Sequence, residues 1–292
     1  MNETMATGLR QPEGPVALTD GRVALVETDD SRRCLTMIAA GGIRHEICRP
    51  GGRPTGLAVD GDNCFWVAGG PENSLVRLSP EGRTLQVIEG GKDGPFLYPN
   101  DLAFGPDGLL YMTDTGVRIS DLLEGADLNP DFFRAPYNGR VYQIDPADGQ
   151  VLRVLATGLF YANGIAFGPD GLLYYSETLT GKIYRQIVGG RQELFAQVMS
   201  VPAVKALRGP AGMAFDRSGM LYCTMYGQGE ICLVDSTGKI VGHIRTNGTR
   251  PGNIAFTLDG KYALITEQEN GVLEKITAPR PGLPLHMPSI GY

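Results

Sequence analysis

The stretch Pro99–Asp114, PNDLAFGPDGLLYMTD, decides the fold, because the chain repeats its pattern along most of its length. A small or polar residue opens the pattern, an apolar run follows, a Gly/Asp turn comes next, and a second apolar run closes it. Two short apolar runs around such a turn are typical of a β-hairpin. Five further segments share the pattern: Glu13–Glu27, Pro54–Ala68, Ala162–Glu177, Pro210–Thr224 and Pro251–Glu267.

Third and fourth apolar runs follow most of these hairpins, as GRVYQIDP and VLRVLATG do after Pro99–Asp114. Six repeats of four short strands predict an all-β, six-bladed β-propeller with four-stranded antiparallel blades and a central channel. A linear β-solenoid is the competing architecture, but its repeats are usually shorter. Radial stacking buries the faces that a single blade would leave bare. We therefore expect residues 1–292 to form a single propeller domain.

Composition and charge argue against several classes of partner. The chain of 292 residues has 26 basic and 32 acidic residues, a formal net charge of −6 and no basic run. Nucleic acid and anionic membranes are therefore not expected as partners. No apolar segment approaches the roughly 20 residues that span a bilayer, and the N-terminal MNETMATGLRQPEG lacks the apolar core of a secretory signal. These features predict a cytoplasmic protein and leave its oligomeric state open.

One repeat carries a long insertion, at 117–138, between its second and third strands, and a second long segment, 196–209, joins two blades. Strand alternation places both at the mouth of the channel where the innermost strands begin. The insertion is predicted to be a lid, with decoration or an oligomer contact as the alternative. Its Phe132, Phe133 and Tyr137 are predicted to form an aromatic wall for a hydrophobic substrate, unless they pack the loop onto the blade.

The residues that open the six innermost strands occupy equivalent places and should meet around the axis. They are Glu13, Thr55, Asn100, Asn163, Ala211 and Gly252. The carboxylate of Glu13 and the carboxamides of Asn100 and Asn163 predict a site for one divalent cation. Calcium or magnesium suits such oxygen ligands, and manganese, iron or zinc can accept them. A single Asn before a strand usually caps a turn, but three oxygen side chains in register on three blades favour a site.

These motifs resemble those of the senescence marker protein / gluconolactonase / luciferin-regenerating enzyme family, the regucalcin family. Glu13-Gly14-Pro15 and the repeated hairpins carry the resemblance, which covers nearly the whole chain. It implies a six-bladed propeller, and many members of the family hydrolyse sugar lactones with one divalent metal in the channel. It further implies Glu13 and Asn163 as metal ligands. It makes Asn100 a substrate-binding or outer-shell residue, which we also count among the candidate ligands.

The family's third ligand, an Asp that is also its suggested general base, falls on Ala211. Losing that carboxylate should weaken metal binding and leaves no base at this place. Substitutes at the same mouth are Asp101, Asp114, Glu177, Tyr226, Asn253 and Glu267. Of these, Asp101 and Tyr226 are predicted to be catalytic because they should project nearest the axis. Asn253 is predicted to bind substrate together with Asn100.

Three hypotheses on function follow. The leading one is a metal-dependent hydrolase of a small lactone or similar cyclic ester, resembling a gluconolactonase, with a displaced base. The second is an enzyme of another reaction type on the same scaffold, such as a lyase, an isomerase or a condensing enzyme like strictosidine synthase. The third is a propeller that binds a small molecule without catalysis. Fold alone does not choose among them.

Overall fold

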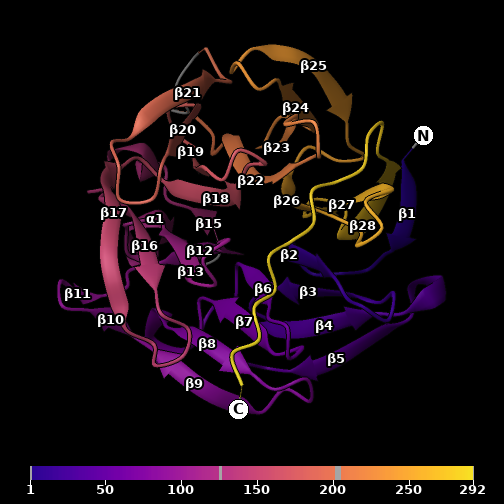
Figure 1. Cartoon of the computed structure of the whole chain (residues 1–292), viewed down its shortest axis with the longest axis horizontal. Coiled ribbons are helices and arrows are strands. Elements are labelled where there is room, and N and C mark those ends of the chain that lie inside the picture. The colour runs from indigo at the N-terminus through magenta and orange to yellow at the C-terminus, as the bar shows by residue number, and fades with distance from the viewer. Residues whose placement is uncertain (1, 125–126, 201–204, 292) are drawn as a thin grey trace.

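The structure is a computed structural model that describes residues 2–124, 127–200 and 205–291. Its main strands form six four-stranded antiparallel sheets arranged as blades around an axis (Figure 1), so the predicted six-bladed β-propeller is confirmed. The blades follow one another around the ring in chain order. Residues 125–126 and 201–204, which belong to the two long segments noted in the sequence, lie outside the described residues, as do residues 1 and 292.

The first three blades are each built from strands in chain order, with the innermost strand first. Blade 1 comprises β2 (Pro12–Ala17), β3 (Val23–Glu27), β4 (Cys34–Ile38) and β5 (Arg44–Cys48). Blade 2 comprises β6 (Leu57–Val59), β7 (Phe65–Ala68), β8 (Leu75–Leu78) and β9 (Thr84–Ile88). Blade 3 comprises β12 (Pro99–Phe104), β13 (Leu110–Asp114), β16 (Gly139–Ile144) and β17 (Val151–Leu159).

The last three blades complete the ring, and the sixth joins the two ends of the chain. Blade 4 comprises β18 (Ala162–Phe167), β19 (Leu173–Glu177), β20 (Lys182–Gln186) and β21 (Glu193–Gln197). Blade 5 comprises β22 (Gly209–Phe215), β23 (Leu221–Tyr226), β24 (Glu230–Val234) and β25 (Ile240–Arg245). Blade 6 comprises β26 (Pro251–Phe256), β27 (Tyr262–Glu267), β28 (Val272–Thr277) and, outermost, β1 (Glu3–Ala6). The pairing of β1 with β28 closes the ring.

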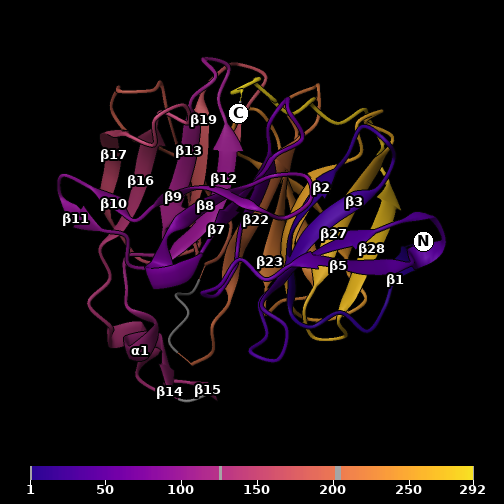
Figure 2. The same cartoon turned by 90° about the horizontal axis from the view of Figure 1, so that it is seen from below.

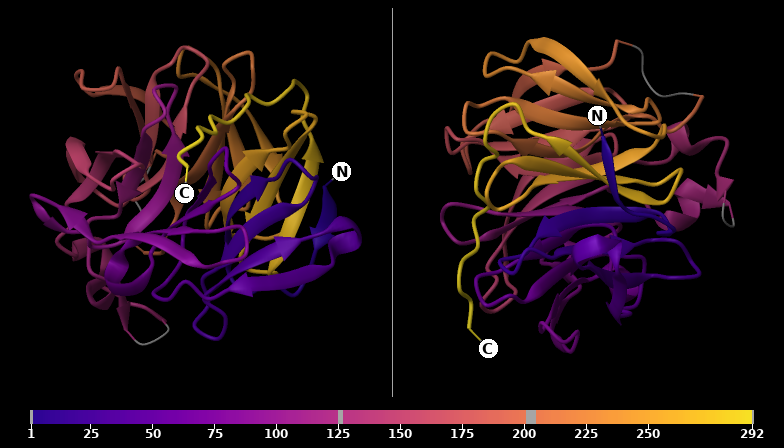
Figure 3. Two further views of the ribbon diagram at one scale, coloured as in Figure 1. Left: turned by 60° about the horizontal axis from the view of Figure 1, so that its bottom comes forward. Right: turned by 90° about the vertical axis from the view of Figure 1, so that its right-hand side faces the viewer.

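Shorter elements lie outside the blades. They are β10 (Gly90–Gly91), β11 (Gly94–Pro95), α1 (Ile119–Leu122), β14 (Leu123–Glu124), β15 (Asp127–Leu128) and the 3-10 turns Ala40–Gly42, Pro71–Asn73 and Phe132–Arg134. The helix α1 and the hairpin β14–β15 belong to the insertion and project from one end of the ring, whereas the C-terminal segment runs over the opposite end (Figures 2 and 3). Among the described residues, no helix is long and apolar enough to cross a membrane.

Aromatic contacts between blades recur around the ring. In each case a residue of a second strand packs edge-on or tilted against the innermost strand of the next blade. The pairs are Trp66–Phe104, Tyr111–Phe167, Tyr174–Phe215 and Tyr222–Phe256, with ring centroids 4.7–6.1 Å apart. Such pairs each contribute about 0.5–1.5 kcal/mol beyond their buried area. The repeated sequence pattern therefore stabilises the joints between blades as well as the blades themselves.

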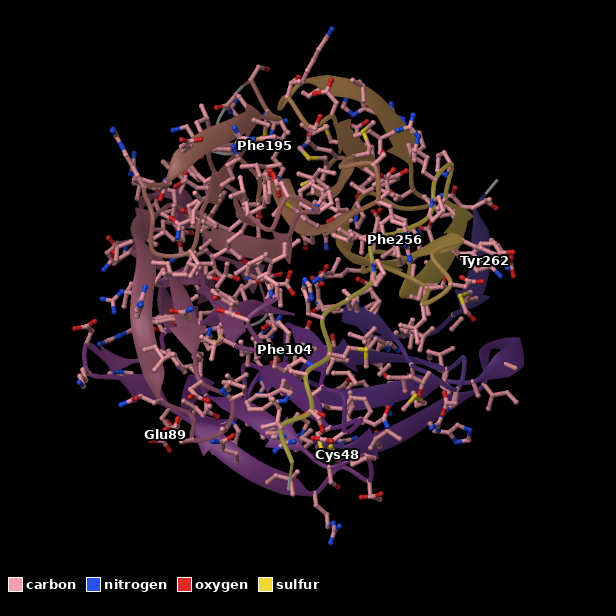
Figure 4. All side chains as sticks on the ribbon, in the orientation of Figure 1. Cys48, Glu89, Phe104, Phe195, Phe256 and Tyr262 are labelled. Carbon is pink, nitrogen blue, oxygen red and sulfur yellow. The ribbon has the colours of Figure 1, made fainter. Side chains whose placement is uncertain are left out.

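The C-terminal segment crosses the end of the channel opposite the insertion, which we call the lower end although Figure 2 draws it at the top. The segment Leu283–His286 and the ends of the innermost strands line an apolar cavity of about 100 Å³ there. The backbone N–H of Leu283 donates to the carbonyl of Phe215 in blade 5 at 2.8 Å, so the segment is tied to the sheet. Figure 4 shows Phe104 and Phe256 close to this central crossing, with other labelled residues nearer the rim. The lower end is thus a packed, mainly apolar region, with Asp101 and Asn253 among its polar lining residues.

Candidate functional site

The opposite end of the channel opens into a cavity of about 550 Å³, a size usual for small-molecule sites. We call it the mouth cavity. Both long segments border it, as strand alternation predicts. Their lining residues are Leu122, Leu123, Asp127, Leu128, Lys205, Ala206 and Leu207. The mouth cavity is therefore enclosed partly by irregular segments and partly by the innermost strands.

A β-bulge near the start of the innermost strands orients the ring residues, which lie below the two long segments. The register shifts between Glu13 and Val16 in β2, and at the equivalent places in β12, β18, β22 and β26. A bulge bends its strand and re-aims side chains. Five of the six ring residues line the mouth cavity: Glu13, Thr55, Asn100, Asn163 and Ala211. Residues up to two hundred positions apart thus share one cavity.

Asn100 and Asn163 are held in the same way by their own blades. The Nδ2 of Asn100 donates to the hydroxyl of Thr115 at 3.0 Å, and the Nδ2 of Asn163 donates to the hydroxyl of Thr178 at 3.1 Å. Each threonine comes one residue after the second strand of its blade. No donor among the described residues bonds either Oδ1, so both carbonyl oxygens are available to a ligand.

Glu13 brings a carboxylate to the same cavity from blade 1. The Nε2 of Gln268 donates to its Oε1 at 2.5 Å. Gly252 leaves it room, because a Cβ at that place would collide with the Glu13 carboxylate. Burial, and secondarily the nearby charge of Asp101, raises the pKa of Glu13 to about 8, while the hydrogen bond from Gln268 opposes the shift. An adjacent divalent cation would favour the charged form.

Asp101 lies one position deeper and lines the lower cavity together with Asn253. Its carboxylate accepts hydrogen bonds from the backbone N–H of Leu102 at 2.9 Å and of Ile165, in blade 4, at 3.3 Å. Burial raises the pKa of Asp101 to about 6, against these bonds and one from Asn253. Asp101 is therefore mostly ionised at neutral pH, but it faces the lower cavity and is tied to two blades. Its catalytic role and the substrate-binding role of Asn253 stay predictions.

Tyr226 lines the mouth cavity from blade 5, the blade in which Ala211 is only 2% exposed. Its hydroxyl donates to the Oε1 of Gln268 at 3.3 Å, and Gln268 in turn donates to Glu13. Burial is the main cause that raises the pKa of Tyr226 to about 12. The phenol is therefore protonated at neutral pH, which suits a hydrogen-bond donor rather than a general base.

The other acids at the ends of second strands are engaged by the backbone. Asp114, Glu177 and Glu267 each accept a hydrogen bond from the backbone N–H seventeen residues earlier, at 2.8–2.9 Å. Each carboxylate thus caps the loop that leads into the innermost strand of its own blade. None of the three lines either cavity, whereas Tyr226 lines the mouth cavity and Asp101 lines the lower one.

The three aromatic residues predicted to wall the substrate pocket pack within or beside the insertion. Phe132 is 2% exposed, and the ring of Phe133 meets it nearly at right angles with centroids 5.9 Å apart. Tyr137 contacts the ring of Tyr161 at 6.1 Å. This is the packing alternative that the sequence left open, and leucines of the insertion form the apolar side of the mouth cavity instead. A direct role for the three in binding stays a prediction.

Several residues that line the mouth cavity were not predicted from the sequence, among them Arg53, Arg250 and Gln268. The strand register aligns Gln268 of blade 6 with the threonines that hold Asn100 and Asn163. Extending the repeat alignment one residue beyond the second strand would have found it. The two arginines lie two positions before the ring residues of their blades, at places that the repeat alignment did not include.

A cation in this cavity would depend on carboxamide oxygens. Among residues 2–124, 127–200 and 205–291, no group of three or more His, Cys, Asp or Glu side chains could hold a metal ion. Glu13, Asn100 and Asn163 offer one carboxylate and two amide oxygens, a donor set that suits a hard divalent cation with open coordination positions. The residues present thus fit such an ion, with Ala211 adding no ligand.

Comparisons with known proteins agree with this architecture. Residues 90–267, more than half of the chain, match the family model described as the SMP-30/Gluconolactonase/LRE-like region. A gluconolactonase of Zymomonas mobilis is 26% identical over 301 aligned residues, which cover 92% of this chain and 80% of that protein. Strictosidine synthase-like protein 6 of Arabidopsis thaliana is 29% identical over 161 residues, covering 52% of this chain and 40% of that protein.

Solved structures share the whole fold at lower sequence identity. A calcium-binding protein, regucalcin, from Agrobacterium tumefaciens superposes with a TM-score of 0.78 and 18% identity. The superposition covers 100% of this chain and 98% of that one. The six-bladed ring, the channel and the chain order are therefore common to the two proteins.

Proposed function

Because the chain belongs to the SMP-30/gluconolactonase/LRE-like family, we propose that it is a metal-dependent hydrolase of small lactones that acts in the mouth cavity. The observation that carries this proposal is the convergence of Glu13, Asn100 and Asn163 on one cavity, with both amide nitrogens already engaged. Similarity to a gluconolactonase over most of both chains supports the reaction class. Calcium is the first ion to test, since regucalcin shares this fold and is a calcium-binding protein.

The chain would hold the ion through Glu13 and Asn163, with Asn100 as a third oxygen or as a contact to substrate. A divalent cation bound there would supply Lewis acidity to an ester carbonyl or acidify a water molecule. Gln268 orients the Glu13 carboxylate by the bond to Oε1. Because outer-shell bonds of this kind fix a ligand's direction, Gln268, Thr115 and Thr178 act as positioning residues.

Proton handling must be arranged without a carboxylate at Ala211. Tyr226 carries its proton at neutral pH and reaches the mouth cavity, so it can donate to an ester oxygen by exchanging the long bond to Gln268 for one to substrate. Asp101 is the ionised acid that lies next to the ring in sequence and can accept a proton from below. We further propose that the insertion 117–138 serves as a lid, whose Leu122, Leu123 and Leu128 exclude water from the bound lactone.

Ala211 favours a second candidate function, an enzyme of another reaction type on this scaffold. A lyase or isomerase needs a placed acid and base but no activated water. Such an enzyme would not need the Asp that the family uses at this position to ligate the metal and activate water. The match to a strictosidine synthase-like protein over about half of this chain supports keeping this candidate. A cation-binding protein that hydrolyses no lactone would favour it.

Metal analysis combined with a panel of lactones tests the proposed function. The wild type should bind a divalent cation and hydrolyse at least one lactone, and Glu13→Ala should reduce both by at least about 100-fold. Glu193→Ala is the matched control, because it removes a carboxylate that is 65% exposed on the outermost strand of blade 4. Unchanged cation binding and hydrolysis in Glu13→Ala would show that the site lies elsewhere.

A further inference from the structure

A second ring of side chains lies above the ring of Glu13. The residues two places before the ring residues lead into the innermost strands, or begin one, at equivalent places in the six repeats. These six are Gln11, Arg53, Tyr98, Tyr161, Gly209 and Arg250. All but Gly209 line the mouth cavity. We call this set the upper ring.

Two members of the upper ring hold a backbone conformation that side chains rarely adopt. The φ angles of Gln11 and Tyr161 are 48° and 68°. Non-glycine residues in the left-handed region cost stability and cluster at ligand sites. Gln11 and Tyr161 are therefore held in place by the surrounding fold rather than by local preference.

Arg53 of blade 2 is fixed in the wall of the mouth cavity. Its Nη1 donates to Asp30 at 3.1 Å and its Nη2 donates to Gln11 at 3.2 Å. The side chain of Arg53 is 21% exposed, whereas that of Asp30 is 63% exposed, so water screens the Asp30 charge more strongly. The buried Nε of Arg53 has no hydrogen-bond partner among the described residues. Each Nη of Arg53 carries a second N–H, so Arg53 keeps positive charge and donor capacity at the cavity through these two atoms rather than through the buried Nε.

Arg250 of blade 6 adds a second guanidinium on the other side of blade 1. Its backbone N–H is held by Glu267 at 2.9 Å, but its side chain forms no ion pair with the described residues. The charge of Arg250 favours ionisation of Tyr226, although burial dominates the pKa of that phenol. Arg250 therefore faces the Tyr226 side of the cavity, and its charge also acts on the carboxylate of Glu269 without an ion pair.

The lining of the mouth cavity is positive in a chain that is negative. Its charged residues are Arg53, Lys205 and Arg250 against Glu13 and Asp127, a balance of +1, whereas the whole chain carries −6. A divalent cation on Glu13 would raise the balance further. A concave site with this sign concentrates anions, and guanidinium groups match the geometry of carboxylate and phosphate.

We infer that the substrate carries an anionic group, a carboxylate or a phosphate, which Arg53 and Arg250 bind above the Glu13 ring. This inference rests on the proposed function and narrows it from lactones in general to acidic lactones. The anionic group lies between the two arginines, over blade 1, and the cyclic ester points down toward Glu13, Asn100 and Asn163. Neutral sugar lactones lack the group that the upper ring is built to take.

Three lactones of one ring size test the inference: a neutral aldonolactone, one with a free carboxylate and one with a phosphate monoester. The wild type should show a higher kcat/KM for an anionic lactone. Arg53→Gln and Arg250→Gln should each reduce the ratio of anionic to neutral kcat/KM by about 10- to 100-fold, chiefly through KM. Arg245→Gln, which removes an equal charge from a side chain that is 81% exposed on β25, should leave the ratio unchanged.

Calorimetric titration with a cyclic ether carboxylate and a cyclic ether phosphate, neither of which can be hydrolysed, separates the two proposals. Binding of either that weakens about tenfold or more in Arg250→Gln supports the anion site even if no lactone is hydrolysed, and the tighter ligand identifies the anion. Efficient hydrolysis of neutral lactones with a ratio that neither arginine variant changes would overturn the anion site and leave the lactonase standing. Because Arg250 is exposed, its variant keeps the test valid if Arg53→Gln fails to fold.

Discussion

The ring of side chains at the mouth cavity is built in one way in blades 3 and 4 and in another way in blades 5 and 6. In blades 3 and 4, a threonine one residue after the second strand holds the asparagine of its own blade. In blades 5 and 6, the ring residues Ala211 and Gly252 offer no side chain to hold, and Tyr226 and Gln268 take the threonine's place. These longer side chains bond to each other and reach Glu13 of blade 1.

The difference teaches that the repeated backbone does not depend on the ring side chain. The bulge recurs in β18 and β22 at the same place. The same hydroxyl bond also joins blade 4 to blade 5 and blade 5 to blade 6: Ser176 donates to the carbonyl of Ala211 at 3.0 Å, and Thr224 donates to that of Gly252 at 2.9 Å. The scaffold is satisfied whether a blade carries Asn163 or Ala211. A blade can therefore change its chemistry while its fold stays.

Removing the side chain of Asn163 should have the largest effect, because it makes blade 4 like blade 5. We expect Asn163→Ala to lower cation affinity and lactone hydrolysis by at least about 100-fold. The melting temperature should change little, because Thr178 keeps its bond to Pro210. Titration calorimetry and thermal unfolding measure the two effects. Asn163→Asp, which keeps an oxygen at the same place, is the control, and wild-type affinity in Asn163→Ala would contradict the prediction.

The converse change, Ala211→Asp, should give blade 5 a ligand and have the next largest effect. Cation affinity should rise by about 10- to 100-fold, because a second carboxylate joins Glu13 in the cavity. Without cation, the same variant should lose about 2 kcal/mol of unfolding free energy, since Ala211 is 2% exposed and the new carboxyl is buried. Denaturant unfolding with and without calcium measures both. A variant with unchanged affinity would mean that residue 211 does not face the cation.

The fold and the meeting of the ring residues at one cavity could be predicted from the sequence. The repeats place residues that are far apart in the chain at equivalent positions around one axis. Equivalent residues of six similar hairpins must point to one axis, so Glu13, Asn100 and Asn163 could be grouped without knowing a contact. The aromatic joints between blades follow from the same repeat. Everything that recurs in the sequence was thus accessible to pattern and alignment.

The parts of the site that do not recur could not be predicted. Tyr226 was grouped with Asp114 because both end a second strand, yet β23 has six residues and β13 five. The register pairs Asp114 with Pro99 but Met225 with Pro210, so Tyr226 corresponds to Thr115. The insertion has no repeat to align with, so the packing of Phe132 depends on tertiary contacts that composition does not reveal.

The positioning residues of blade 4 and of blade 6 should have equal effects on cation affinity, smaller than those of the ring residues. We expect Thr178→Val, which frees the amide of Asn163, and Gln268→Met, which frees Glu13, each to lower cation affinity by about tenfold. Thr178→Ser should restore most of it, because the hydroxyl is kept. Side-by-side calorimetric titrations measure the three variants. If only one of Thr178→Val and Gln268→Met lowered the affinity, the ligand next to the other residue would not depend on that residue for its orientation.

Tyr226→Phe should have the smallest effect, because the hydroxyl acts on Glu13 only through Gln268, by a bond of 3.3 Å. Losing one such bond at an open cavity should cost about two- to fivefold in kcat/KM. Since burial raises the pKa of Tyr226 to about 12, the phenol stays protonated, and its removal should leave the pH profile parallel to that of the wild type between about pH 6 and 9. A loss above about 100-fold, with the rise of activity toward alkaline pH removed, would instead make Tyr226 the base that replaces the missing carboxylate at Ala211. The chain of bonds through Gln268 would then carry a proton rather than only hold Glu13 in place.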